Sequence, residues 1–205
     1  MNYLAHVFLA RHSSDAMIGG LLGDFVKGSI HRYPAEIRAG ILLHRAIDRY
    51  TDAHSIVRAS RALVSVRRRR FAGIMMDVFF DHFLARHWQS FADTPLPAFT
   101  RATYVELLAR SGEFPERLQR ILPHMAAHDW LGSYQDVEAI DAAINGIARR
   151  FRRANTLQGG AQEMLDNYAV LQVNFLRFFP ELLCFVQAMR DQEAVCATTL
   201  RRTGT

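Results

Sequence analysis

Two aspartates stand inside one of the most apolar stretches of this chain, residues 74–83. Asp77 and Asp81 are four residues apart, so on a helix they lie on one face, one turn from each other. A bare carboxylate among methionine, valine and phenylalanine side chains costs several kcal/mol unless it is protonated, paired with a cation or bound to a metal ion. The segment therefore requires a fold that brings partners to both carboxylates.

Further apolar segments also carry acidic and imidazole side chains. His44, Asp48 and Asp52 follow one another at spacings of four, and Asp24 and His6 each lie among hydrophobic residues. An all-helical protein builds a metal site by turning such residues from several helices to a common inner face. The candidate metal ligands and catalytic residues are Asp24, His44, Asp48, Asp77 and Asp81, with His6 as a further ligand.

Each candidate also has an ordinary structural explanation. Asp48 suits an ion pair with Arg45 on an exposed helix face, and Asp24 suits one with Lys27, three residues away. A lone histidine on an apolar helix, such as His6, is usually a satisfied core residue. The apolar flanks of Asp77 and Asp81 favour a site over these alternatives.

Hydrophobic residues recur at helical spacing along the chain, and the alternation typical of strands is nearly absent. The sequence therefore predicts an all-α fold, a single-domain helical bundle over residues 1–197, with a C-terminal tail, residues 198–205, that frays. Caps, prolines and glycines place the helices at about residues 2–11, 15–28, 34–52, 55 onward, 68–91, 98–111, 115–127, 134–150 and from 161 onward.

The chain carries a formal net charge of +5, with the densest basic run at Arg67, Arg68, Arg69 and Arg70. This run is either a solvated helix start or a docking patch for an acidic partner, nucleic acid or protein. No uninterrupted apolar run approaches the roughly 18 residues of a membrane span, so no membrane partner is expected. The two cysteines form no C-x-x-C pair, which is typical of reduced thiols in a cytoplasmic protein.

The dipeptide His128-Asp129 matches the signature of metal-dependent HD phosphohydrolases. It stands beside Trp130 near an expected helix end, where Asp129 is equally suited to cap a helix. We interpret this pair as structural.

Oxygen and imidazole ligands without a nearby thiolate favour Mn²⁺, Mg²⁺ or Fe²⁺ over a structural Zn²⁺. Such an ion polarises phosphoryl oxygens and lowers the pKa of a bound water, so the cluster suits hydrolysis of a phosphoester. The chain has no G-x-x-x-x-G-K-[ST] and no G-x-S-x-G motif, which makes P-loop and serine-hydrolase chemistry poor fits.

Several motifs, in order and at consistent spacing, resemble the acyl carrier protein phosphodiesterase family. The resemblance covers nearly the whole chain and is densest over its first ninety residues. It is carried by residues 1–6, 20–28, 44–52, 77–85, 130–131, 134 and 145–150.

The resemblance implies a divergent, all-helical HD-type phosphohydrolase fold and a Mn²⁺-dependent enzyme of lipid metabolism. Members of this family hydrolyse the phosphodiester that joins 4′-phosphopantetheine to a serine of acyl carrier protein, a partner of fatty acid biosynthesis. Acyl carrier protein is acidic, so the resemblance favours an acidic protein over nucleic acid as the partner of Arg67–Arg70. Two alternatives stay open: an HD-like nucleotide phosphohydrolase, and a non-catalytic helical binding module.

Overall fold

In a computed structural model, the backbone is described for residues 1–203 and the side chains for residues 1–192. Within these residues the chain forms helices and no strands, which confirms the all-helical prediction. The α-helices are α1 (Tyr3–Leu9), α2 (Ser14–Leu22), α3 (Ala35–Ala53), α4 (Ser55–Ala62), α5 (Ala72–Arg86), α6 (Leu96–Ala109), α7 (Glu116–Ala127), α8 (Trp130–Ser133), α9 (Val137–Ala148), α10 (Ala161–Asp166) and α11 (Tyr168–Thr203). Short 3₁₀ turns occur at η1 (Arg69–Phe71), η2 (Trp88–Ser90) and η3 (Ser111–Glu113).

The single helix expected over residues 68–91 is instead η1, α5 and η2 in succession. The α-helix ends at Arg86, and the buried indole of Trp88 then donates a hydrogen bond to the carbonyl of Thr94 at 2.7 Å. This bond fixes the turn that leads to α6, and sequence periodicity alone does not reveal it. At the other end of the chain, the backbone of α11 is helical to Thr203, so it includes most of residues 198–205.

Helices α2 and α3 pack more extensively than any other pair of described elements, and glycines allow their backbones to touch. A Cβ atom added at Gly19 would lie 2.3 Å from the carbonyl oxygen of Ile37, and one added at Gly40 would lie 2.3 Å from that of Ala16. Both distances are far inside van der Waals contact, so this crossing requires glycine. The close approach sets the α3 side chains that follow Gly40 against the C-terminal end of α2.

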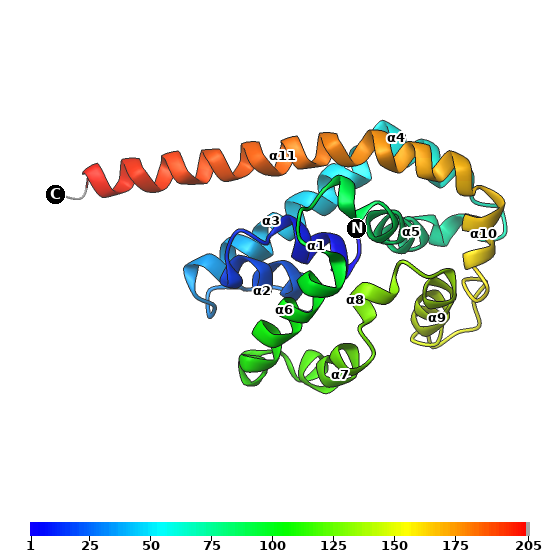
Figure 1. Ribbon diagram of the computed structural model, residues 1–205, viewed down its shortest axis with the longest axis horizontal. Helices are drawn as coiled ribbons and strands as arrows, with labels where there is room; N and C mark the ends of the chain where they lie inside the picture. The colour runs from blue at the N-terminus through cyan, green and yellow to red at the C-terminus, as the bar shows by residue number, and fades with distance from the viewer. Residues whose placement is uncertain (204–205) are drawn as a thin grey trace.

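Helix α5 contributes many residues to the core, and Figure 1 shows it beneath the long helix α11. Phe80 of α5 packs against Phe175 and Phe178 of α11, with ring centroids 5.6 Å apart in both pairs, and all three side chains are fully buried. One face of α11 is therefore core.

The segment Tyr168–Gln192 of α11 is long and apolar enough to cross a membrane by length and composition alone, which is weak evidence for a span. Charged residues such as Arg177 and Glu181 interrupt it.

Candidate metal centre

Three potential metal ligands meet where α1 crosses α3. His6 comes from α1, and His44 and Asp48 stand one turn apart on α3. The Nε2 atom of His6 lies 3.1 Å from Asp48 Oδ1, and Nε2 of His44 lies 3.2 Å from Asp48 Oδ2. One potential donor atom from each of these residues lies within 4.8 Å of the donor atoms of the other two. Among the described residues, this cluster is the arrangement best suited to a divalent cation.

The imidazole of His44 is held by groups outside the cluster. Its Nδ1 lies 2.8 Å from the carbonyl oxygen of Gly20, so Nδ1 carries the proton and Nε2 faces the carboxylates. Burial lowers the pKa of His44, but Asp48 and Asp24 outweigh it and raise the pKa above its usual value. A cation binding at Nε2 therefore competes with a proton.

Gly23 makes room for this imidazole. A Cβ atom at Gly23 would lie 2.2 Å from Cγ of His44, far inside van der Waals contact with the ring. The close approach of the α2 C-terminus thus fixes the position of the His44 ring. The sequence contained this glycine directly before Asp24, yet spacing arguments did not assign it a role.

His6 is buried, and its ring stacks on that of His44 with centroids 3.6 Å apart. Burial and the neighbouring His44 lower the pKa of His6 to about 3, so the ring is neutral at pH 7. Neutral imidazole is the form that binds metal ions. The donor set of two imidazole nitrogens and one carboxylate therefore fits a divalent transition metal such as Mn²⁺ or Fe²⁺.

Two other predicted residues, Asp24 and Asp77, lie at the edge of the cluster. Asp24 Oδ1 is 3.9 Å from Nε2 of His44, and its side chain is 40% exposed. Asp77 Oδ1 accepts a hydrogen bond from the amino group of Met1 at 2.8 Å, and that amino group also lies 3.7 Å from Asp48 Oδ1. Burial alone would lower the pKa of this amine, but Asp77 and Asp48 raise it to about 10. Asp77 is thus linked to Asp48 through an ammonium group.

Asp81 does not join the cluster in this structure. It is fully buried, and its two oxygens accept hydrogen bonds from the backbone N–H groups of Asn2, Leu4 and Ala5 at 3.1, 2.8 and 3.4 Å. Burial raises the pKa of Asp81 to about 7, and these N–H donors oppose the rise. Asp81 thus serves as the N-terminal cap of α1, the role that the side chain of Asn2 does not fill. Asp81 therefore contributes to the position of His6 indirectly, because it holds the start of α1, the helix that carries His6.

Two further polar residues of these helices, Asp52 of α3 and His82 of α5, have structural partners outside the cluster. Asp52 forms an ion pair with Arg61 of α4. Both nitrogens of His82 are occupied, Nδ1 by the carbonyl of Tyr134 at 2.8 Å and Nε2 by the hydroxyl of Tyr168 at 2.9 Å, so His82 is a satisfied core histidine.

The structure also accounts for the His128-Asp129 pair. Asp129 caps α8, where its Oδ1 accepts from the N–H of Gly132 at 3.1 Å and its backbone adopts a left-handed φ of 41°. The structural interpretation of this aspartate is confirmed.

The predicted docking arginines divide into two kinds. Arg68 donates to the carbonyl of Thr156 at 2.8 Å and pairs with Glu163 at 3.1 Å, and Arg69 donates to the carbonyls of Ala62 and Val64. These two arginines hold loops together. Arg67 and Arg70 are exposed, and the Arg70 guanidinium lies over the ring of Phe71, 4.5 Å from its centroid.

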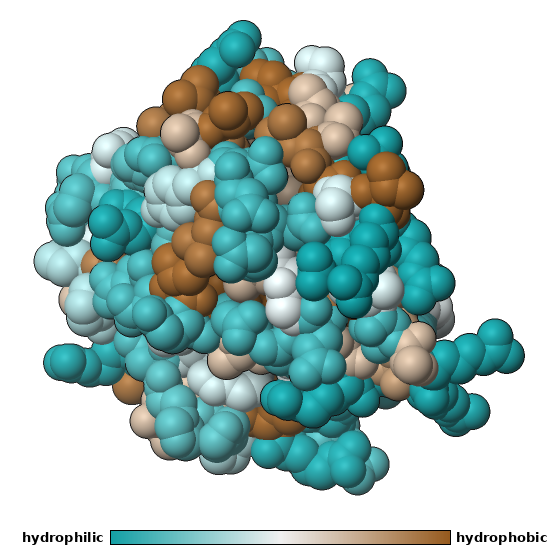
Figure 2. All heavy atoms as spheres, turned by 90° about the vertical axis from the view of Figure 1, so that its right-hand side faces the viewer, coloured by the Kyte–Doolittle hydropathy of each residue, from teal (hydrophilic) through white to brown (hydrophobic). Residues whose placement is uncertain are grey.

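The two exposed arginines border a second basic segment, Arg149–Arg153. Phe71 packs against Phe151 with ring centroids 5.6 Å apart, and the carbonyl of Arg67 accepts a hydrogen bond from Thr156. Figure 2 shows this end of the molecule, where hydrophilic side chains cover much of the surface and hydrophobic ones form smaller patches. Arg67, Arg70 and the exposed arginines of residues 149–153 form what we term the basic face.

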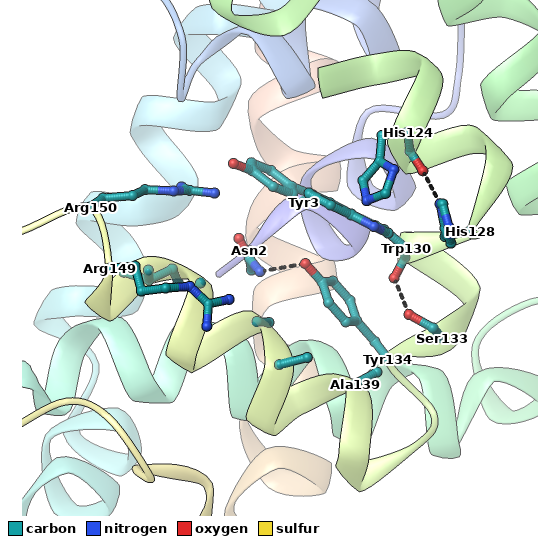
Figure 3. Close-up of a pocket in the computed structure, with 14 residues that line it drawn as sticks. Asn2, Tyr3, His124, His128, Trp130, Ser133, Tyr134, Ala139, Arg149 and Arg150 are labelled. Atoms are coloured by element: carbon teal, nitrogen blue, oxygen red, sulfur yellow. Dashed lines mark hydrogen bonds between the residues drawn. The ribbon is translucent and has the colours of Figure 1, made fainter. Parts of the chain in front are cut away.

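A cavity of about 420 Å³ opens beside the first turn of α1. In Figure 3, Tyr3, Trp130 and Tyr134 surround it, and Arg149 and Arg150 extend toward it from the end of α9. None of these was predicted to line a cavity, because they come from three separate parts of the chain, at α1, α8 and the end of α9, which only the packing of the helices brings together.

The fold and the donors define an all-helical protein with a two-histidine, one-carboxylate centre suited to a divalent cation. The chain belongs to the acyl carrier protein phosphodiesterase family, whose model matches residues 1–182.

Curated relatives with that name agree with this assignment. The protein of Serratia proteamaculans is 37% identical over 195 residues, which cover 94% of this chain and all of the relative. Those of Klebsiella pneumoniae and Yersinia pestis are each 35% identical over 185 residues, which cover 89% of this chain and 96% of each relative. No solved structure matches the chain significantly.

Proposed function

We propose that this chain is a cytoplasmic, Mn²⁺-dependent phosphodiesterase that hydrolyses 4′-phosphopantetheine from the serine of holo acyl carrier protein, giving the apo protein. The observation that carries the proposal is the convergence of His6, His44 and Asp48, in a chain whose relatives bear the name acyl carrier protein phosphodiesterase. A divergent HD-type fold is part of the same proposal, supported by a His/Asp cluster on a helical scaffold.

In this proposal His6, His44 and Asp48 hold the ion, with Mg²⁺ or Fe²⁺ as alternatives to Mn²⁺. A bound divalent cation would polarise the phosphoryl oxygens and lower the pKa of a water molecule. Asp24 lies beside His44 and is partly exposed, and burial raises its pKa above the usual range. It is therefore placed to accept the proton of the attacking water.

Mass spectrometry of holo acyl carrier protein after incubation with the chain and Mn²⁺ tests the activity. Release of 4′-phosphopantetheine appears as a direct loss of mass from the carrier protein. An unchanged mass, together with hydrolysis of a nucleotide phosphoester, would favour the nucleotide phosphohydrolase alternative. An unchanged mass without any hydrolysis would favour the binding module.

Gly23→Ala is expected to lower kcat on the order of a hundredfold, because the added methyl group displaces the His44 ring and small misplacements at a reacting centre carry such costs. Steady-state rates on holo acyl carrier protein give the measurement. Gly73→Ala is the matched control, since its Cβ would meet the Arg61 side chain no closer than 3.6 Å, which is ordinary contact. Equal activity in both variants would show that the position of His44 does not matter.

We further propose that the basic face docks the acidic carrier protein. The double variant Arg67→Glu with Arg70→Glu is expected to raise KM for holo acyl carrier protein about tenfold at low salt, with a smaller effect on kcat, because steering acts mainly on association. Hydrolysis of bis(4-nitrophenyl) phosphate, a small substrate without a carrier protein, should be nearly unchanged. Arg58→Glu with Arg101→Glu makes the same charge change at exposed positions on α4 and α6. If the variant with Arg67→Glu and Arg70→Glu has an unchanged KM, these two arginines do not dock the carrier protein, and the next residues to test are Arg149, Arg150, Arg152 and Arg153.

A further inference from the structure

The cavity beside α1 has two chemically different walls. Four small residues of α9 form one wall: Ala139, Ala142, Ala143 and Gly146. Trp130, Tyr3 and Tyr134 supply aromatic surface and polar hydroxyl groups, and Tyr134 is fixed in place because its hydroxyl accepts a hydrogen bond from the side chain of Asn2 at 2.9 Å. A volume of about 420 Å³ falls within the range of roughly 300–1,000 Å³ that small-molecule sites occupy.

The cavity lies one helical turn of α1 from the metal centre. Asn2 and Tyr3 line the cavity, and His6 follows on the same face of the helix, one turn later. Charged groups of both sites act on Tyr3. Burial and Asp24, at the edge of the metal centre, raise the pKa of Tyr3, and Arg150, at the cavity, opposes this rise. A ligand that reaches from the centre into the cavity would have to pass Tyr3.

Positive charge stands where the cavity meets the surface. Arg149 and Arg150 are exposed and line its rim, and they are the first residues of the exposed arginine segment that belongs to the basic face. Figure 3 shows the Arg150 side chain directed toward Tyr3. An acidic protein docked on the basic face would thus lie next to the cavity.

We propose that this cavity binds the pantetheine arm of holo acyl carrier protein while its phosphodiester lies at the metal centre. This inference rests on the proposed function. The arm combines a branched apolar group with two amides, which suits a cavity with a small-residue wall and an aromatic, hydroxyl-bearing wall. Its length separates the phosphate from the thiol end, which suits a cavity that lies one helical turn from the centre.

Gly146 allows the cavity to be filled without disturbing the protein. A Cβ atom at this position would have no heavy atom within 4 Å, so a larger side chain extends into open space. Gly146→Leu also replaces a poor helix former with a good one in α9, so it should fold. Gly112→Leu is the matched control, because its Cβ is equally free and it lies in η3, outside the lining of the cavity.

The Gly146→Leu variant is expected to lower kcat/KM for holo acyl carrier protein at least about tenfold relative to wild type, with an unchanged rate on bis(4-nitrophenyl) phosphate, which lacks the arm. Gly112→Leu should leave both rates unchanged. If Gly146→Leu keeps the wild-type ratio of the two rates, the cavity does not bind the arm.

A second measurement separates this inference from the proposed function. Pantetheine carries no phosphate, and it should change the fluorescence of Trp130 saturably in wild type and in Gly112→Leu but not in Gly146→Leu. The signal reports on the cavity because Trp130 lines it, whereas the other tryptophan, Trp88, is buried and does not. If the chain fails to hydrolyse holo acyl carrier protein, this titration decides the inference alone. Saturable binding that Gly146→Leu loses supports it, and a flat response in wild type overturns it.

Discussion

Asp48→Asn is expected to lower kcat/KM for holo acyl carrier protein by more than about a hundredfold, because loss of a group that merely orients a metal ligand already costs roughly 10–100-fold. The carboxylate of Asp48 contacts both His6 and His44, at 3.1 and 3.2 Å. Burial acts to raise the pKa of Asp48, but its hydrogen bonds with His44 and His6 and the nearby Met1 ammonium hold that pKa well below its usual range. The amide keeps the size of the side chain and removes its charge, so the variant should fold. Steady-state rates in added Mn²⁺ and far-UV circular dichroism give the measurement.

Asp77→Ala extends this prediction to the edge of the cluster. Removing the carboxylate leaves the Met1 ammonium without its closest partner, 3.7 Å from Asp48, where an unpaired positive charge repels a divalent cation. We therefore expect this variant to lose most activity as well. If a folded Asp48→Asn or Asp77→Ala variant keeps more than a tenth of wild-type activity, the site does not depend on these helices in the way proposed.

Asp81→Ala is expected to destabilise the protein by about 3 kcal/mol. The substitution leaves the buried N–H groups at the start of α1 without their acceptor. Each such group left unpaired costs roughly 1–3 kcal/mol. For a chain of this size the midpoint of thermal unfolding should fall by roughly 6–12 °C. Asp81→Asn keeps one acceptor oxygen and should lose less. Differential scanning calorimetry and urea unfolding measure both variants.

Asp136→Ala provides the comparison for this result. Asp136 is also an aspartate at a helix N-terminus, at the start of α9, but it is exposed and its side chain makes no capping hydrogen bond. Its replacement should change the free energy of unfolding by less than about 0.5 kcal/mol. Similar losses in Asp81→Ala and Asp136→Ala would contradict the capping role of Asp81.

The helical class and the joint presence of histidine and aspartate on α3 could be predicted from the sequence, because spacings of three and four determine which residues share a helix face. The groups that lie opposite such a helix face could not be predicted. Asp77 and Asp81 lie on one face of α5, yet one meets the Met1 amine and the other caps α1. A spacing pattern places a side chain on a helix and does not reveal which backbone groups will lie opposite.

The roles of Gly23 and Arg68 were hidden for a similar reason. Gly23 matters because His44, 21 residues later, occupies the space of its missing side chain. Arg68 stands in a dense basic run but donates to the carbonyl of Thr156, 88 residues away. The cavity walls likewise combine α1, α8 and α9. Such long-range contacts become visible only when the packing of the helices is known.

Binding of Mn²⁺ to the metal-free protein, followed by electron paramagnetic resonance of the free ion, tests the central claim most directly. We predict saturable binding in wild type that His44→Ala and Asp48→Asn both lose. Asp129→Asn should bind as wild type does, because Asp129 caps α8 and asparagine tolerates its left-handed backbone. Equal Mn²⁺ binding by wild type, His44→Ala and Asp48→Asn would contradict the assignment of the centre to His6, His44 and Asp48.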